Sequence, residues 1–395
     1  MKNLGLYIHI PFCVKKCDYC DFVSYCDKNE LVEKYINALK NEIKINLGEI
    51  DKSDYKISTI YIGGGTPSSI DSKYIIDILE TIKTCCRERR PRRSKIPCDN
   101  IEITIEINPG TITEEKLIDY KNAGINRLSI GLQETNNELL KQIGRIHTYE
   151  EFLETYNLAR KVGFKNINVD LMIGLPSQSI SDIKESLNKV TNLNPEHISV
   201  YSLILEEGTK LYQKYKNKEI KLPDEELERN MYWYVKNTLE NNGYVHYEIS
   251  NFSKKRYESK HNMSCWKQEE YIGLGAAAHS YIEGIRYSNT ENLEEYLKGK
   301  GDQKGSDPFW SPCQTIHEKQ TLEDMPKEYM LLGLRKIEGI SIQQFKNKFG
   351  ENPIFLFRNE LNKLVEEDLL EVDGDSIKLT NKGLDLANQV WQEFI

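Results

Sequence analysis

Short runs of apolar and β-branched residues alternate with longer amphipathic stretches over the first two thirds of the chain. This alternation is typical of βα units arranged around a parallel sheet. The apolar runs predict six strands, at Leu6–Ile10, Ile57–Ile62, Ile101–Ile107, Arg127–Gly131, Ile167–Ile173 and His197–Leu203. The amphipathic stretches predict helices at Glu30–Leu47, Ser72–Cys85, Glu114–Ala123, Tyr149–Val162 and Ser181–Asn192. Six strands favour an α/β fold of the incomplete (β/α)6 type, an open TIM-like barrel.

The pattern changes near residue 290. A chain of 395 residues exceeds the roughly 250–300 residues that one core serves. We therefore expect a barrel domain over residues 1–290 and a smaller C-terminal α+β domain over residues 291–395. The latter is predicted to hold three helices and a hairpin, a winged-helix-like order, at Met325–Ile337, Ile342–Phe349, Pro353–Glu366, Leu370–Val372 and Ile377–Leu379. Its acidic surroundings favour a packing or partner-docking module over a DNA-binding one.

The charge of the chain limits its partners. It carries 53 basic and 61 acidic residues, a formal net charge of −8, which argues against a general nucleic-acid or membrane-surface binder. No basic leader with a following apolar run opens the sequence, and no apolar stretch is long enough to span a membrane. We expect a cytoplasmic protein without an integral membrane segment.

One basic segment, Arg87–Lys95, departs from the acidic trend. It is predicted to be a solvated loop, and the alternative is a contact for an acidic partner or for propionate groups. Cys85, Cys86 and Cys98 flank this segment and are predicted to be packing residues.

Three of the nine cysteines fall within eight residues, as Cys13, Cys17 and Cys20 in the spacing C-x3-C-x2-C. They follow the first predicted strand, and such grouping favours metal ligation in a reducing compartment. Soft thiolates select iron–sulfur clusters, zinc or copper. Three thiolates leave one iron of a [4Fe–4S] cubane open, whereas structural zinc would need a fourth ligand such as His9 or Cys26. The ligand count favours the cluster.

The second predicted strand runs into Gly63–Gly64–Gly65–Thr66–Pro67. Glycines lack a Cβ, so the backbone can come close to a bound small molecule and turn its amides toward it. Loops at the carboxyl ends of barrel strands converge on one mouth. We therefore expect the glycine segment and the cysteine loop to lie together.

The cysteine spacing, with Tyr19 directly before the last cysteine, resembles the signature of the radical SAM superfamily. The resemblance extends to the oxygen-independent coproporphyrinogen oxidases and their HemW-type heme chaperone relatives through YIHIPFCVKKCDYCDF, GGGTPSSI, ITIEINPGTI, RLSIGLQE, IGRIH, VDLMIGLP, HNMSCW and IGLGAAAHSY. It implies a [4Fe–4S] cluster whose open iron binds S-adenosylmethionine (SAM), and reductive cleavage of SAM to a 5′-deoxyadenosyl radical. It further implies SAM contacts by Tyr7, Tyr19, Gly64, Gly65, Thr66, Glu106, Gln133, Arg145 and Asp170.

Three features resemble the chaperones more than the oxidases. Only six residues precede Tyr7, and Phe22 stands where the oxidases carry a fourth cysteine. The segment from His261 to Trp266 resembles the HNxxYW motif associated with heme handling, with Cys265 in place of the usual tyrosine. The resemblance implies that His261 ligates heme iron and that Trp266 covers a porphyrin face.

Two histidines, His261 and His279, each have two possible interpretations. A hydrogen-bonded loop histidine is the other interpretation of His261. His279 is a second candidate heme ligand, for which a buried structural role is the interpretation we favour.

We therefore expect a heme chaperone that binds a [4Fe–4S] cluster, SAM and heme. Its partners would be heme-accepting proteins such as a respiratory enzyme, and an electron donor such as a flavodoxin or a ferredoxin. The alternative is an oxygen-independent coproporphyrinogen III oxidase, which decarboxylates propionates by radical hydrogen abstraction. A radical methylation or other transfer on a tetrapyrrole also stays open.

Overall fold

A computed structural model of the chain describes residues 1–50, 54–87, 101–298 and 314–395. The basic segment predicted from Arg87 to Lys95 lies outside the described residues from position 88 onward, and so does Cys98. Cys85 and Cys86 lie in the described part and are buried.

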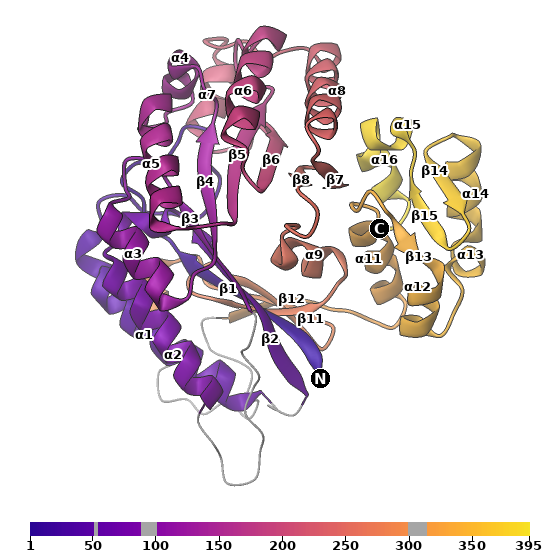
Figure 1. Cartoon of the computed structure of the whole chain (residues 1–395). Helices are drawn as coiled ribbons and strands as arrows, with labels where there is room; N and C mark the ends of the chain where they lie inside the picture. Colours follow the sequence, from indigo (N-terminus) through magenta and orange to yellow (C-terminus); the bar gives the residue numbers. More distant parts are fainter. Residues whose placement is uncertain (51–53, 88–100, 299–313) are drawn as a thin grey trace.

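A mixed sheet, twelve-stranded in the described part of the chain, forms the larger unit (Figure 1). Its strands are β1 (Lys2–Ile10), β2 (Tyr55–Gly64), β3 (Glu102–Ile107), β4 (Arg127–Gln133), β5 (Ile167–Ile173), β6 (His197–Ser202), β7 (Val245–Glu248), β8 (Asn251–Ser253), β9 (Glu270–Leu274), β10 (His279–Ile282), β11 (Ile285–Asn289) and β12 (Gln314–Lys319). Strands β1 to β6 lie in chain order and are parallel. The six predicted strands and the α/β class are confirmed.

The sheet continues beyond the six strands at both edges. β9 pairs parallel with β1, and the antiparallel strands β10, β11 and β12 follow it. At the other edge β8 and β7 add antiparallel to β6. The outermost strands, β12 and β7, are not paired with each other, so the sheet is open. These additions were not predicted because the strands are short and carry many polar residues.

Helices cover the outer face of the parallel strands. The five predicted helices are present as α1 (Val32–Glu49), α2 (Ser72–Arg87), α3 (Glu114–Ala123), α5 (Tyr149–Val162) and α6 (Ile180–Leu193). Thr148 and Ser179 are the N-cap residues of α5 and α6, and each forms a capping box with the third residue of its helix. The structure adds α4 (Asn137–Gln142), α7 (Lys210–Lys216), α8 (Glu225–Asn241), α9 (Lys260–Trp266) and α10 (Leu293–Lys298). No helix within the described ranges is long and apolar enough to cross a membrane.

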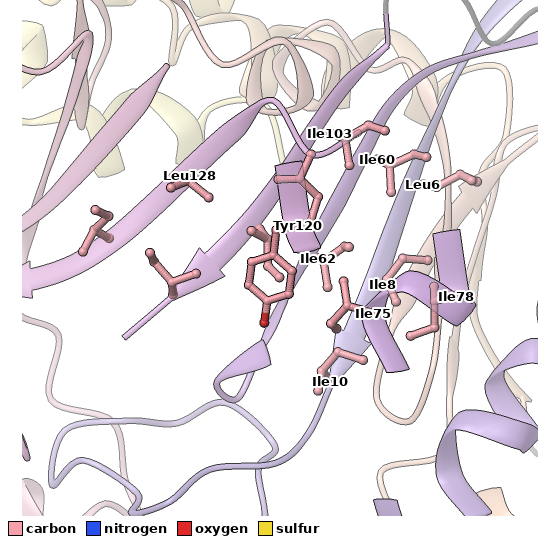
Figure 2. Close-up of a cluster of buried hydrophobic side chains, with 14 of the residues drawn as sticks. Leu6, Ile8, Ile10, Ile60, Ile62, Ile75, Ile78, Ile103, Tyr120 and Leu128 are labelled. Atoms are coloured by element: carbon pink, nitrogen blue, oxygen red, sulfur yellow. The ribbon is translucent and has the colours of Figure 1, made fainter. Parts of the chain in front are cut away.

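The parallel strands have two different faces. On β1 the side chains of Leu6, Ile8 and Ile10 are buried in one apolar cluster with Ile75 and Ile78 of α2 (Figure 2). Successive side chains of a strand point to opposite faces. The residues between them, such as Tyr7 and His9, therefore face the inside of the barrel. The inward residues of the other strands are also largely polar: Thr59, Tyr61, Thr104, Glu106, Arg127, Ser129, Gln133, Asn168, Asp170, His197, Ser199 and Tyr201.

The C-terminal unit has a core of its own, from Tyr329 to Phe394. It consists of α11 (Asp324–Gly333), β13 (Ile340–Ser341), α12 (Ile342–Phe349), α13 (Pro353–Leu356), α14 (Arg358–Glu366), β14 (Leu370–Asp373), β15 (Ser376–Leu379), α15 (Asn381–Asp385) and α16 (Ala387–Gln392). The predicted hairpin is present as β14 and β15. The predicted third helix is divided in two, because Phe357 leaves the helical conformation with φ −114° and ψ 38°.

Helix α11 also ends earlier than predicted, at Gly333. A Cβ on Gly333 would lie 2.6 Å from Cγ1 of Ile340, so the two segments pack closely there. The division of the chain after residue 290 stays a prediction. The pairing of β12 with β11 and the burial of Leu293 and Tyr296 in the larger core favour a division after Lys319.

Replacing Ile8 with alanine tests the assigned core. Ile8 is fully buried, so Ile8→Ala is expected to lower the free energy of unfolding by about 2–5 kcal/mol. Leu322 is 89% exposed, so Leu322→Ala is expected to change the free energy of unfolding by less than about 0.5 kcal/mol. Denaturant unfolding followed by circular dichroism measures both, and equal losses would contradict the assignment.

Candidate functional site

The loop after β1 carries Cys13, Cys17 and Cys20. Its start is fixed by backbone hydrogen bonds, since Cys13 N donates to Tyr25 O at 3.0 Å and Tyr25 N donates to Pro11 O at 2.7 Å. Cys20 N donates to Cys17 O at 3.2 Å, which makes a tight turn between the last two cysteines. The loop therefore presents its three thiols at the carboxyl end of β1.

The glycine segment lies directly against this loop. Gly65 N donates to Ile10 O at 2.9 Å, and Thr66 N donates to Phe12 O at 2.8 Å. A Cβ on Gly65 would stand 2.8 Å from Phe12 O, and Gly64 has φ +112°, which side chains disfavour. Glycine is required at both positions, and the prediction that the two segments lie together is confirmed.

A cavity of about 410 Å³ opens at the carboxyl ends of the parallel strands. This volume falls within the range of ligand pockets. Most of the predicted cofactor residues line it: Cys13, Cys17, Tyr19, Cys20, Gly64, Gly65, Thr66, Glu106, Gln133, Arg145 and Asp170. Tyr7 is not among the residues that line the cavity; it is the register partner of Tyr61 on the neighbouring strand, and its hydroxyl is 3.1 Å from His9 Nδ1. The individual roles of these residues stay predictions.

The thiols are partly buried and have weak polar partners. Cys13 Sγ is 3.5 Å from Thr66 Oγ1, and Arg145 Nη1 donates to Cys17 Sγ at 3.6 Å. Burial raises the pKa of Cys20 to about 11 and also raises that of Cys13. A bound metal would keep these groups as thiolates.

The arrangement of the thiols bears on the choice between a cluster and zinc. Among the residues that the structure describes, no group of three or more Cys, His, Asp or Glu side chains is arranged to hold a single metal ion. The three thiolates of a [4Fe–4S] cluster bind three different irons, so they stand farther apart than around one ion. The choice of a cluster over a zinc ion stays a prediction from the ligand count of the three cysteines.

Glu106 and Arg145 place an acidic and a basic side chain inside the cavity. Glu106 accepts from Tyr61 Oη at 2.8 Å and from Gly64 N at 3.2 Å, and burial raises its pKa to about 7. Arg145 donates through Nη2 to Asn108 and, at 2.6 Å, to Gly131 O. Its buried Nε has no partner in the described part of the chain. A ligand with both an amine and a carboxylate, such as SAM, fits these two groups.

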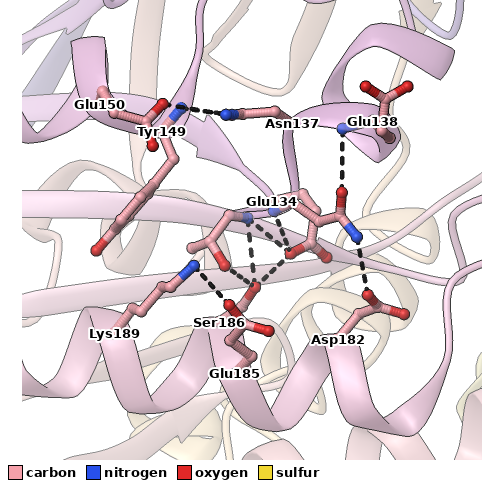
Figure 3. A network of polar contacts seen from close by, with 11 residues as sticks. Glu134, Asn137, Glu138, Tyr149, Glu150, Asp182, Glu185, Ser186 and Lys189 are labelled. Carbon is pink, nitrogen blue, oxygen red and sulfur yellow. Dashed lines mark hydrogen bonds and ion pairs between the residues drawn. The ribbon is translucent and has the colours of Figure 1, made fainter.

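A buried carboxylate holds the end of β4. Gln133 has φ +73°, an unusual backbone conformation for this residue type. The next residue, Glu134, is 1% exposed and accepts from Thr135 N and Gln178 Nε2, each at 2.6 Å. It also accepts from Ser186 Oγ (Figure 3). Hydrogen bonds to a buried charge are strong, and each lost partner would leave a group unsatisfied. This network fixes the turn that directs Gln133 into the cavity.

Several cavity residues were missed by the sequence reasoning. They are Lys15, Lys16, Phe22, Tyr61, Ile107, Asn108, Ser129, Gly131, Met172 and Tyr201. Two of them follow a simple pattern, since Ser129 and Gly131 are alternate residues of β4 and therefore share a face. Extending each predicted site residue by two positions along its strand would have found Gly131, from Gln133, and Met172, from Asp170.

The two predicted heme residues lie elsewhere, on α9, which contacts β2, β9 and the C-terminal α11 (Figure 1). His261 is 8% exposed, and its Nδ1 is 2.9 Å from Thr59 Oγ1. Trp266 stacks on the guanidinium of Arg335 at 4.4 Å. Neither residue lines the cavity, and their roles in heme binding stay predictions. His279 is exposed on β10 and stacks on His317 at 5.2 Å, so the expected burial of His279 is wrong.

Comparison with known proteins agrees with this geometry. The family model of the radical SAM superfamily matches residues 7–190, and that of the HemN C-terminal domain matches residues 320–386. The heme chaperone HemW of Bacillus subtilis is 39% identical over 389 residues, 98% of each chain. The heme chaperone HemW of Lactococcus lactis is 36% identical over 100% of this chain and 98% of its own.

One solved structure covers the whole chain. Coproporphyrinogen III oxidase (HemN) from Escherichia coli, described as a radical SAM enzyme, superposes with a TM-score of 0.81 at 22% identity. The match covers 100% of this chain and 90% of that one. At this identity the likeness shows the fold alone.

The fold, the cysteine-lined cavity and the family models define a radical SAM protein, a class that implies a [4Fe–4S] cluster and SAM. Within this class the chain belongs to the HemW family, because relatives of that name share 36–39% identity over almost its whole length. The resemblance found in the sequence is thereby confirmed.

Replacing Cys17 with alanine tests the cluster ligands. A cubane that loses one of three thiolates is not retained, so Cys17→Ala is expected to lose most of the roughly four irons and four sulfides per chain. Iron and acid-labile sulfide measured after anaerobic reconstitution check this, with Cys26→Ala as a control that keeps the full content. A Cys17→Ala protein with full iron and sulfide would refute the assignment.

Proposed function

We propose that this protein is a heme chaperone that holds a [4Fe–4S] cluster on Cys13, Cys17 and Cys20, binds SAM beside it, and also binds heme. It delivers the heme to acceptor proteins such as a respiratory enzyme, and it works in the cytoplasm. The observation that carries this proposal is the match to proteins named heme chaperone HemW over nearly the full length of both chains.

In this proposal, different cavity residues bind different groups of SAM. Glu106 accepts hydrogen bonds from the amine, and the free Nε of Arg145 meets the carboxylate. Asp170, which is fixed by Asn168 Nδ2 at 2.7 Å, is placed to accept from ribose hydroxyls. When bound and reduced, the cluster supplies the single electron that cleaves the sulfonium C–S bond. An outside donor, such as a flavodoxin or a ferredoxin, provides that electron.

The position of Phe22 supports the chaperone over the oxidase. It occupies the place of the fourth cysteine of the oxidases, and its ring is 65% exposed at the rim of the cavity. A phenylalanine cannot ligate iron, so the cluster loop differs there from the oxidase pattern. Because the likeness to HemN shows the fold alone, it does not favour the oxidase activity.

Heme binding involves His261 and Trp266 in this proposal. In the described conformation the His261 ring is enclosed by Thr59 and Tyr61. Ligation of heme iron therefore requires α9 to move away from β2. Because α9 also contacts α11, such a movement would involve the C-terminal domain.

An anaerobic heme titration of the reconstituted protein, followed by its Soret absorbance, tests the proposal. Wild type is expected to saturate near one heme per chain, because a dedicated site has a fixed capacity. His261→Ala is expected to bind about tenfold more weakly through loss of the axial imidazole. His317→Ala, which removes an exposed histidine outside α9, is the matched control and is expected to bind like wild type.

Two results would count against this account. Absence of saturable binding by wild type would overturn the chaperone proposal, and formation of protoporphyrinogen from coproporphyrinogen would then establish the oxidase. Equal affinity of wild type and His261→Ala would overturn the role of His261 while leaving heme binding in place.

A further inference from the structure

His261 makes contacts that heme ligation does not use. Its imidazole stacks on the ring of Tyr61, with centroids 5.2 Å apart and planes 28° apart. Its Nδ1 shares a hydrogen bond of 2.9 Å with Thr59 Oγ1, and its backbone N donates to Glu102 Oε1 at 3.3 Å. Thr59 and Tyr61 are inward residues of the same strand, two positions apart. The imidazole therefore sits inside the barrel, one layer below Tyr61.

Tyr61 connects this layer to the cavity. Its ring lies against Tyr7 as well as His261, with centroids 6.3 Å from that of Tyr7. Its hydroxyl donates to Glu106 Oε1 at 2.8 Å, and Tyr61 itself lines the cavity. A ring with two aromatic neighbours has less freedom to tilt, which restrains the direction of its hydroxyl.

Glu106 has few other constraints. Its second oxygen accepts from Gly64 N at 3.2 Å, and its carboxylate packs on Gly63, where a Cβ would stand 2.9 Å away. Removing the hydrogen bond from Tyr61 would leave the carboxylate held at one oxygen. The orientation of Glu106 thus depends on Tyr61, and that of Tyr61 depends on the two rings beside it.

We propose that His261 is a positioning residue for SAM: its ring holds Tyr61, whose hydroxyl orients Glu106 toward the amine of SAM. This inference rests on the proposed SAM contact of Glu106 and does not depend on heme. It links the segment from His261 to Trp266 to the proposed SAM site, because His261 contacts Tyr61 inside the barrel. The same imidazole would then serve heme only in a conformation in which it has left Tyr61.

A pair of substitutions at one position separates the ring from the polar contact. His261→Phe keeps a ring against Tyr61 and loses the hydrogen bond to Thr59. His261→Asn keeps a polar group near Thr59 and loses the ring. If the ring carries the effect, His261→Phe binds SAM within about twofold of wild type and His261→Asn binds about tenfold more weakly.

Two further variants test the route through Tyr61. Tyr61→Phe keeps the stack and removes the hydroxyl, and it is expected to weaken SAM binding about tenfold. The double variant His261→Asn with Tyr61→Phe is expected to be little weaker than Tyr61→Phe alone, because residues acting through one contact are not additive. His279→Ala serves as the unchanged control.

SAM dissociation constants are measured by anaerobic equilibrium dialysis without heme, on proteins matched for iron and sulfide content. SAM binding by His261→Asn at wild-type strength, or by His261→Phe as weakly as by His261→Asn, would overturn the proposal. Additive losses in the double variant would also overturn it. Failure of wild type to bind SAM would instead overturn the proposed SAM site.

Heme provides an independent readout on the same proteins. His261→Phe lacks an imidazole, so it is expected to lose heme affinity while keeping SAM affinity. If His261→Phe lost both its heme affinity and its SAM affinity, or kept both, the proposed division would be wrong. That division assigns the ring of residue 261 to SAM binding and its imidazole nitrogen to heme.

Discussion

The alternation of side chains along the parallel strands decides which residues pack in the core and which face the cavity. Because a strand sends successive side chains to opposite faces, residues such as Leu6, Ile8 and Ile10 can pack on helices while Tyr7 and His9 point inward. A shift of register by one residue would exchange the two sets and place the polar residues under the helices. The strand register that buries the apolar side chains under the helices therefore also directs the polar side chains to the interior.

The site follows from this arrangement and from close backbone contacts at the strand ends. The glycine segment bonds to the start of the cysteine loop through Gly65 and Thr66, so these hydrogen bonds hold the two segments side by side at the cavity. The hydrogen bonds to Glu134 likewise hold the turn after β4 in place. The interior polar residues continue from the cavity to His261, which stacks on Tyr61 and belongs to α9, the helix that contacts α11.

Much of the fold and site could be predicted from the sequence. The six parallel strands were visible as apolar runs, and the cysteine spacing and glycine segment marked the cavity because both are local in sequence. The added edge strands were not visible, since β7 to β12 are short and mixed in polarity. The contacts of His261 with Thr59 and Tyr61 could not be predicted either, because they join positions about 200 residues apart. The break at Phe357 depends on packing rather than on helix propensity.

The central claim is that Cys13, Cys17 and Cys20 hold a [4Fe–4S] cluster whose open iron meets SAM in the cavity. Electron paramagnetic resonance of the reconstituted and reduced protein, recorded with and without SAM, tests it most directly. We expect a cluster signal whose g values change when SAM is added, because the amine and carboxylate of SAM would bind the open iron. A signal that stays the same at saturating SAM would contradict it.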